Sequence, residues 1–212
     1  KTAAFILLLA IPGTLLLPVT AGACVGIPDL DRSIVWQVFD GLATLLNLPD
    51  GSGQPFTAAR TPDGVEVDAT IHVTIITYCN GEEPVPGFPN EDIWLESTGG
   101  GMVACMGGTI ADDHTDSEGH TQWSLPMMAG GWDEGETMVV VSGSPVPDGM
   151  GLTLNFNSPD ITGDREVNLA DLAVFAGDYF SGFYFRSDFM RDGVLNLSDV
   201  AIMAGSMGKG CP

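Results

Sequence analysis

Basic residues are scarce in this chain of 212 residues, which has 7 Lys and Arg against 28 Asp and Glu and a formal charge of −21 at pH 7. Nucleic-acid binding requires a basic surface, and so few positive charges cannot supply one. An acidic chain instead attracts cations and repels copies of itself until ions screen its charge. The composition therefore excludes a nucleic-acid partner and favours cation binding.

Cysteine is sparse as well: Cys24, Cys79, Cys105 and Cys211 are the whole set, and no two form a C-x-x-C pair. A zinc ribbon or a thioredoxin-type redox site is therefore disfavoured. Four cysteines allow two disulfides in three connectivities. We expect Cys79 to pair with Cys105, since both fall within the predicted β domain, which leaves Cys24 with Cys211.

Catalytic motifs are missing too, because the chain holds no nucleophile motif and no Gly-rich phosphate loop after a strand. The stretch 112–116 (Asp-Asp-His-Thr-Asp), with His120 nearby, suggests a metal or acid/base cluster, but a solvated turn between strands is the simpler interpretation. We therefore expect no enzymatic activity. An enzyme with an unrecognised acidic site remains a third hypothesis.

The first residues have the three parts of a secretory signal. Lys1 is the basic start, residues 5–17 form an apolar run, and residues 21–23 (Ala-Gly-Ala) form a cleavage site before Cys24. Prolines and a glycine interrupt the run, so we expect no stable membrane span. A cleaved signal predicts an extracellular or cell-surface protein. The alternatives are a lipid anchor on Cys24 and a retained segment 1–23, buried against a neighbouring subunit as an assembly element.

Short apolar runs separated by Gly, Asp and Asn fill the middle of the chain. The clearest is 65–75, where apolar and polar residues alternate with the period of a half-buried strand. Further runs lie at 34–36, 45–46, 93–95, 102–105, 123–125, 138–141 and 152–156. About seven strands at this spacing predict an antiparallel β-sandwich over residues 24–158, with 34–36 and 45–46 as edge strands.

Three segments of this region have a more specific pattern: the strand at 68–71, the turn at 80–87 and the turn-to-strand segment at 115–121. Through them, residues 60–145 resemble a bacterial immunoglobulin-like domain of the invasin/intimin kind. The resemblance implies an Ig-like sandwich that serves as a spacer or an adhesive module. Such domains carry no catalytic residues to transfer.

After Ser158-Pro159 the chain repeats itself. With a shift that places Asp160 on Asp188, eight of the eighteen positions 160–177 are identical. Each copy consists of an acidic twelve-residue loop followed by a helical pattern, which we name loop 1 (residues 160–171) and loop 2 (residues 188–199). The change from period-two strands to this pattern predicts a separate domain over 159–212.

Both loops have oxygen ligands at the spacing that wraps a calcium ion. In loop 1 they are the side chains of Asp160, Thr162, Asp164, Asn168 and Asp171 with the carbonyl of Glu166, and in loop 2 the side chains of Asp188, Asp192, Asn196 and Asp199 with the carbonyl of Val194. Each loop departs once from the pattern. Met190 replaces an oxygen ligand in loop 2, and Arg165 stands in loop 1 where loop 2 has the turn residue Gly193. We expect two Ca²⁺ ions.

A loop followed by a helix, repeated once with Asp in the twelfth position and with no helix before either loop, resembles a dockerin over residues 160–207. The resemblance implies a small α domain with two EF-hand-like loops and a cohesin-like partner, contacted around loop positions 10 and 11. Those positions hold Leu169-Ala170 and Leu197-Ser198, without the usual hydroxyl pair except for Ser198. A domain that packs on its own chain or on the next subunit is therefore an equal expectation.

Two further features of this domain are apolar. Matching stripes on the two helical patterns predict a shared core of Leu172, Phe175, Ala176 and Tyr179 with Val200, Met203, Ala204 and Met207. The connector 179–185 holds five aromatic residues, which either seal the two halves together or form an exposed anchor for a partner. Asn196 also begins a glycosylation sequon, which we discount because calcium should occupy this residue.

The hypothesis that follows is a secreted, non-enzymatic surface or structural protein, mainly β, that mediates calcium-stabilised protein–protein association. Its most specific form is the self-associating subunit of an extracellular fibre. The alternative is a dockerin-type binding module that docks onto a cohesin-bearing scaffold while the sandwich recognises a ligand.

Overall fold

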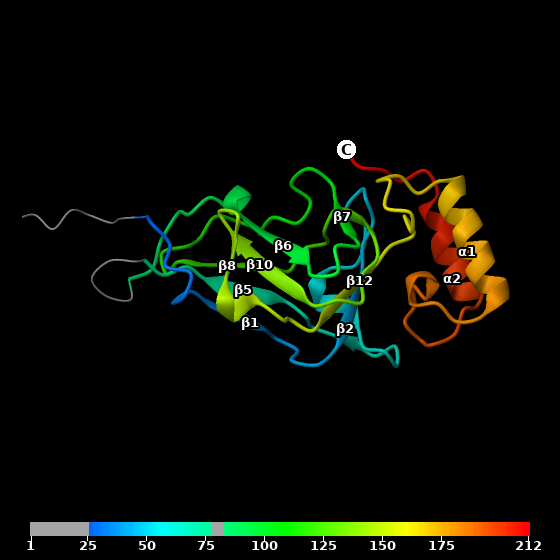
Figure 1. Ribbon diagram of the computed structural model, residues 1–212, viewed down its shortest axis with the longest axis horizontal. Coiled ribbons are helices and arrows are strands. Elements are labelled where there is room, and N and C mark those ends of the chain that lie inside the picture. The colour runs from blue at the N-terminus through cyan, green and yellow to red at the C-terminus, as the bar shows by residue number, and fades with distance from the viewer. Residues whose placement is uncertain (1–25, 78–82) are drawn as a thin grey trace, which may run out of the picture.

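The computed structural model of the chain describes residues 26–77 and 83–212 (Figure 1). It is mainly β with two helices near the C-terminus, as the sequence predicted. The strands are β1 (Ile34–Gln37), β2 (Ala43–Leu46), β3 (Ala59–Arg60), β4 (Glu66–Val67), β5 (Ile71–Thr74), β6 (Ile93–Ser97), β7 (Met102–Ala104), β8 (His120–Trp123), β9 (Ala129–Gly131), β10 (Thr137–Val141), β11 (Ser144–Pro145) and β12 (Leu154–Asn157). The helices are α1 (Leu169–Ser181) and α2 (Leu197–Ser206), and short 3-10 turns include η4 (Phe185–Ser187).

The strands form four small sheets, in the orders β1-β5-β8, β11-β10-β6, β12-β2-β3-β4 and β7-β9. Every pairing within them is antiparallel except that of β12 with β2, which is parallel. The expected edge position is confirmed for 34–36, because β1 lies at the end of its sheet. It is wrong for 45–46, because β12 and β3 flank β2 on both sides.

The segment 65–75 is not one strand. It divides into β4 and β5, which belong to different sheets. The division falls at Asp68, whose Oδ1 accepts hydrogen bonds from the backbone N–H of Thr70 at 2.9 Å and from its hydroxyl at 2.6 Å. Such a local side-chain turn competes with ladder pairing. The predicted alternation is confirmed in β5, where Ile71 and Val73 are fully buried.

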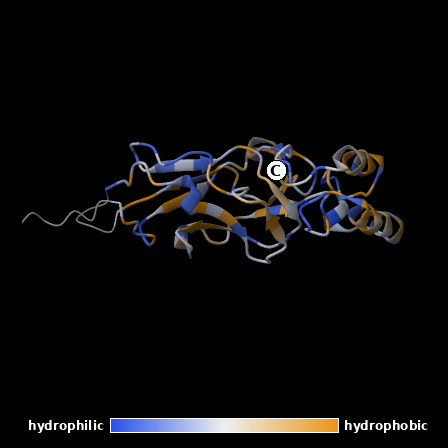
Figure 2. Ribbon diagram, turned by 90° about the horizontal axis from the view of Figure 1, so that it is seen from above, coloured by the Kyte–Doolittle hydropathy of each residue, from blue (hydrophilic) through white to orange (hydrophobic). Residues whose placement is uncertain are grey.

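The main core lies between these sheets, and its largest fully buried side chains are Trp123, Phe56 and Phe156. Trp123 also carries a polar group into the core. Its indole N–H donates to the carbonyl of Thr109 at 3.0 Å, so burial of the ring leaves no unpaired donor. The orange segments in the middle of Figure 2 follow this apolar interior.

The helices α1 and α2 lie side by side at one end of the molecule, beyond β2 and β12 (Figure 1). A second apolar core joins them to the β region. It is formed by Leu46, Leu48, Ile161, Val167, Phe175, Phe189 and Met203. Leu46 and Leu48 come from the β region, and the other residues come from the duplicated segment. The helices are therefore packed onto the sheets rather than suspended from a linker.

The helix stripes differ from the prediction. Phe175 and Met203 are buried as expected, but Leu172 and Val200 are more than a third exposed, and Met207 is exposed as well. The buried face of each helix begins at Asp171 or Asp199, because these acids turn into their loops. Positions four and seven residues later share that face, so the buried stripe is rotated from the one that hydropathy alone indicates.

A disulfide links the β region to the C-terminal segment that follows α2. Cys105, just after β7, is bonded to Cys211 with 5.7 Å between their Cα atoms. The expected pairings of Cys79 with Cys105 and of Cys24 with Cys211 are therefore wrong. The C-terminal segment runs back along loop 1, where the Cys211 N–H donates to the carbonyl of Arg165 at 3.1 Å, and this contact carries Cys211 to β7.

Some expectations lie outside the described residues, namely the signal-like segment 1–23, Cys24, Cys79 and the start of the turn at 80–82. Across the described part of the chain, no helix combines the length and the apolar character that crossing a membrane requires.

Candidate metal centre

Loop 1 lies directly against the β region. The Gly131 N–H in β9 donates to the carbonyl of Asp160 at 2.7 Å. Gly130 faces the carboxylate of the same aspartate so closely that a Cβ atom there would lie 1.8 Å from Asp160 Oδ2. Only glycine fits at this position, and the close approach fixes the first ligand of loop 1 against a rigid strand.

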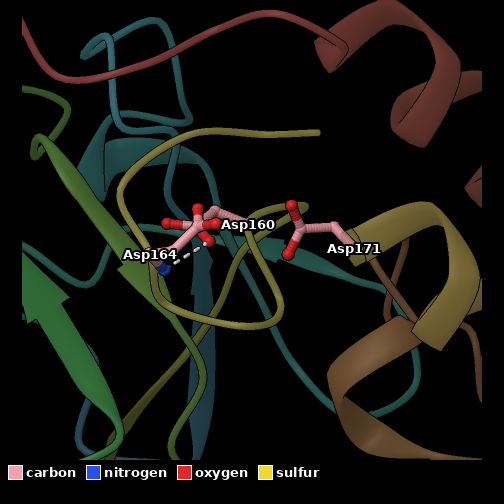
Figure 3. Close-up of side chains that lie close together, drawn as sticks. All are labelled: Asp160, Asp164 and Asp171. Carbon is pink, nitrogen blue, oxygen red and sulfur yellow. Dashed lines mark hydrogen bonds between the residues drawn. The ribbon is translucent and has the colours of Figure 1, made fainter. Parts of the chain in front are cut away.

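Three of the predicted ligands come together in loop 1. One carboxylate oxygen from each of Asp160, Asp164 and Asp171 lies within 4.8 Å of the other two (Figure 3). Asp160 and Asp171 are fully buried, whereas Asp164 is exposed. Among the residues that the structure describes, this is the one group of three such ligands that could hold a metal ion.

Backbone N–H groups hold the carboxylate of Asp160 in place. Oδ1 accepts from Gly163 at 2.9 Å and from Asp164 at 3.1 Å, and Oδ2 accepts from Arg165 at 2.8 Å. The Asp164 bond is the dashed line in Figure 3. These bonds wrap the loop around one carboxylate, so its ligand atoms are positioned by the backbone before any ion arrives.

The pKa of Asp160 is raised to about 6, because burial and the neighbouring carboxylates of Asp171 and Asp164 outweigh the opposing effect of the Arg165 and Asp164 N–H groups. A buried carboxylate without a counter-charge favours its protonated form. A cation in contact reverses that preference, because it stabilises the ionised form. The site therefore has a surplus of negative charge that a divalent ion would neutralise.

The remaining predicted ligands of loop 1 surround this cluster. The Thr162 hydroxyl donates to Asp171 Oδ1 at 2.9 Å. The Asn168 amide donates to Asp164 Oδ2 at 2.9 Å and to the carbonyl of Glu166 at 3.2 Å, which places this carbonyl at the same side of the loop. Asn168 also caps α1, since its Oδ1 accepts the Ala170 N–H at 2.7 Å. This residue therefore links the ligand cluster to the helix.

Most hydrogen bonds of loop 1 recur at the equivalent positions of loop 2. Asp188 accepts the N–H groups of Asp192 at 3.2 Å and Gly193 at 3.0 Å. The Asn196 amide donates to Asp192 Oδ2 at 3.0 Å, and the Asn196 N–H donates to Asp199 Oδ2 at 3.0 Å. The sequence repeat is thus a structural repeat, in which equivalent side chains form equivalent hydrogen bonds.

Loop 2 nevertheless differs in its charge. The guanidinium of Arg191, which is almost fully buried, has its Nη1 atom 3.8 Å from Asp188 Oδ2 and lies over the ring of Phe185, 4.4 Å from its centroid. Burial raises the pKa of Asp188, while Gly193 and Arg191 oppose the rise. Met190 adds only its backbone N–H, which donates to Asp199 Oδ1 at 3.1 Å. Loop 2 therefore has one ligand fewer and a cation of its own.

The fourth and sixth positions of both loops adopt the left-handed conformation. Loop 1 has Gly163 at φ 71° and Arg165 at φ 74°, and loop 2 has Arg191 at φ 55° and Gly193 at φ 77°. Each loop thus places one arginine where glycine is favoured. Arg165 therefore keeps the left-handed conformation of the equivalent Gly193, at the cost of backbone strain. The ligand pattern in the sequence did not predict that Arg191 lies beside Asp188.

The donor set of loop 1 fits calcium. It consists of oxygen atoms alone, which suits a hard cation. A single ion at about 2.3–2.6 Å from each ligand can bridge oxygens that lie up to roughly 5 Å apart, and the three carboxylates lie within 4.8 Å of one another. Asp160, Asp164 and Asp171 would hold the ion, with Thr162 and the Glu166 carbonyl beside them. In loop 2, by contrast, Asp188, Asp192 and Asp199 do not bring three carboxylate oxygens within that distance of one another.

The acidic stretch around 112–116 is used differently. Asp112 Oδ2 accepts the N–H and the hydroxyl of Ser124 at 2.8 and 2.6 Å. Asp116 Oδ1 accepts the N–H groups of Glu118 at 2.8 Å and His120 at 3.0 Å. These carboxylates cap turns between strands, as the simpler interpretation expected.

Comparison of the chain with known proteins gave no match to a family model, to a curated protein or to a solved structure.

Proposed function

We propose that this protein is a secreted, non-enzymatic structural protein that associates with copies of itself through its C-terminal helices, and that calcium bound in loops 1 and 2 stabilises the associating surface. The observation that carries the proposal is the exposure of apolar side chains at equivalent positions of the two helices. Leu169 is 73% exposed and Leu197 is 77% exposed. Exposed apolar side chains that together form a patch mark an interaction site.

The surface extends beyond these two leucines. Large apolar side chains on the same helices and their connector are exposed as well, namely Leu172, Val200, Phe180, Phe183 and Tyr184. Within the aromatic connector, residues 179–185, some rings are buried and others are exposed. Phe185 is buried beneath Arg191, whereas Phe180 is 87% exposed. Exposed aromatic side chains such as these are enriched in the cores of protein interfaces.

Calcium would act on this surface through the helix starts. Asp171 and Asp199 are the third residues of α1 and α2, and each accepts the N–H of the cap residue of its helix in a capping box. Leu169 and Leu197 are the first residues of the same helices. An ion bound to either aspartate therefore orders the turn that presents the exposed leucine.

The charge of the chain gives calcium a second role. A formal charge of −21 opposes the approach of two copies. Two bound Ca²⁺ ions would remove four negative charges, at the end of the molecule where the exposed leucines lie. We therefore expect association to need calcium for two reasons: it orders the first turns of the helices, and it reduces the repulsion between negatively charged copies.

Sedimentation velocity with and without calcium tests this function. We expect larger species with excess calcium and monomers with excess chelator, and a Leu169→Asp/Leu197→Asp variant that stays monomeric in both. Met106→Asp is the matched control, because Met106 is 98% exposed but belongs to a turn after β7. A wild-type chain that stays monomeric at high concentration with calcium would contradict self-association.

Docking onto a cohesin-like domain is the second candidate, and the same observation favours it, since Leu169 and Leu197 occupy loop position 10. A calcium-dependent pull-down from the native secretome separates the two candidates. Recovery of further copies of the chain supports self-association, whereas recovery of a cohesin-bearing protein supports docking.

A further inference from the structure

The outer face of the β1-β5-β8 sheet carries two histidines from neighbouring strands. In the strand register Trp36 lies opposite His72, His72 lies opposite Gln122, and Thr74 lies opposite His120. Residues opposite one another in a sheet share a face. His72 and His120 are therefore diagonal neighbours, on the face turned away from the main core.

The two imidazole rings meet at their edges. His72 Nδ1 lies 3.0 Å from His120 Nε2, while the ring centroids are 5.2 Å apart and the planes differ by 28°. A centroid separation so much larger than the nitrogen separation means that the two nitrogens face each other across the gap. Facing ring nitrogens can share one proton, or they can share one metal ion.

We propose that His72 and His120 form a bidentate binding site for a divalent transition-metal ion, Cu²⁺ or Zn²⁺, separate from the calcium loops. Two imidazole nitrogens on one ion at about 2.0 Å each lie roughly 2.8–3.3 Å apart, depending on whether the angle at the metal is square or tetrahedral. The observed 3.0 Å lies within that range. Nitrogens that face each other at 3.0 Å direct their lone pairs at one another, so each ring must turn by roughly 40° to bring both lone pairs onto one ion about 2.0 Å away.

The surroundings hold the ligands in place. The Trp36 ring stacks on His72 at 4.7 Å with an interplanar angle of 11°, which limits the rotation of this imidazole. On the other side, Asp116 Oδ2 lies 3.8 Å from the Nδ1 atom of His120, the ring nitrogen that does not face His72. A carboxylate at the far nitrogen orients a metal-binding histidine and increases its basicity.

The protonation of His72 suits a ligand. Burial lowers the pKa of His72, the neighbouring His120 lowers it further, and Asp68 opposes the shift. A neutral imidazole nitrogen is the form that binds a metal ion. Nitrogen ligands favour Cu²⁺ and Zn²⁺ over Ca²⁺, so the two kinds of site would select different ions.

The test is a Cu²⁺ titration of the calcium-saturated protein, followed by tryptophan fluorescence. Excess Ca²⁺ keeps the acidic loops occupied, and Trp36 reports on the histidine pair because it stacks on His72. We expect quenching with one equivalent of Cu²⁺, and the Trp36→Phe variant should lose most of that quenching.

Three histidine variants complete the test, since the chain has three histidines in all. His72→Gln and His120→Gln should each weaken Cu²⁺ binding at least about tenfold. His114→Gln is the matched control and should bind as the wild type does, because the exposed His114 has only Glu91 as an ionic neighbour, at 3.9 Å. Electron paramagnetic resonance should show two imidazole nitrogens on Cu²⁺. Wild-type affinity in His72→Gln and His120→Gln, or a single nitrogen on the ion, would overturn the proposal.

Discussion

Asp160 has two roles in loop 1. It is a buried acid whose pKa burial and neighbouring carboxylates raise to about 6, and it also accepts three backbone N–H groups that shape the loop. The first role favours a cation, and the second keeps the ligands in position without one. Asp188 has the same place in loop 2, but Arg191 already supplies part of its counter-charge. We therefore expect the two loops to bind calcium unequally.

Substitution of these two aspartates measures the difference. In the wild type, excess chelator should lower Tm, because an ion that binds only the folded chain stabilises it by mass action. Asp160→Asn should remove most of the calcium-dependent rise in Tm, and Asp188→Asn should remove less of it. Calorimetry in excess calcium and in excess chelator gives both values. An unchanged wild-type Tm would rule out the metal, and equal losses would contradict the inequality.

The two left-handed arginines give a second pair of matched variants. Arg165 is exposed at φ 74°, and within the described part of the chain its side chain forms no hydrogen bond or ion pair, so Arg165→Gly should relieve strain and raise stability by up to about 1 kcal/mol. Arg191→Gly relieves similar strain at φ 55° but removes the ion pair with Asp188 and the contact with Phe185. It should therefore destabilise. Urea denaturation in chelator measures both, and shifts of the same sign would contradict this account.

At the scale of the element, the sequence pattern predicted most strands and both helices. Alternation located β5, and the acidic loops located the starts of α1 and α2, because Asn168 and Asn196, two of the predicted ligands, are the cap residues of these helices. The division of 65–75 was not predicted, since it depends on a local hydrogen bond of Asp68 that alternation does not register. The rotated helix stripes were missed because a buried aspartate counts as polar in any hydropathy pattern.

An ion pair fastens the end of α1 to η4. Asp178 accepts two hydrogen bonds from the Arg186 guanidinium, both at 2.8 Å, and one from the Ser187 hydroxyl at 2.7 Å. Burial of Asp178 works to raise its pKa, but the bonds from Arg186 and Ser187 prevail and lower it. A group with a lowered folded-state pKa stabilises the fold above its unfolded value and loses that effect as the pH falls through the folded value.

Asp178→Asn should therefore cost about 1–3 kcal/mol at neutral pH. The difference from the wild type should begin to shrink below about pH 4, where the carboxylate of the unfolded chain takes up a proton, and should be lost once the pH falls through the lowered folded-state pKa. Denaturant unfolding at both pH values measures this. Asp113→Asn is the control, because Asp113 is exposed and its side chain forms no hydrogen bond or ion pair with any other described residue. A difference that is the same at both pH values would contradict the role of the ion pair.

At the scale of the whole molecule, the sequence allowed for a C-terminal domain that packs on its own chain, but it did not predict which residues meet there. A resemblance to a dockerin implies an independent domain, yet Leu46 and Leu48 share a core with Phe175 and Met203. Hydropathy shows that these residues are apolar but not which of them meet across more than a hundred positions. The cysteine pairing failed for the same reason. The packing of the C-terminal segment along loop 1, rather than membership of one predicted domain, brings Cys211 to Cys105.

This junction predicts that the sheets and the helices unfold together. Calorimetry of the wild type should show one transition, and calcium should shift that transition as a whole, because loop 1 lies against β9 through Gly130 and Gly131. Cys105→Ser/Cys211→Ser should lower stability by up to about 5 kcal/mol, the loop-closure entropy for a separation of 106 residues.

The apolar core should still keep one transition in that variant. Adding Leu48→Asp, which places a charge in the core, should split the transition in two, and only the one that belongs to the helices should then respond to calcium. Ala58→Asp is a matched control for the added charge, since Ala58 belongs to the 3-10 turn η1 (Phe56–Ala58) and is not among the buried core residues. Two transitions in the wild type, with calcium moving only one, would show that the helices fold as an independent domain and that the junction does not couple them.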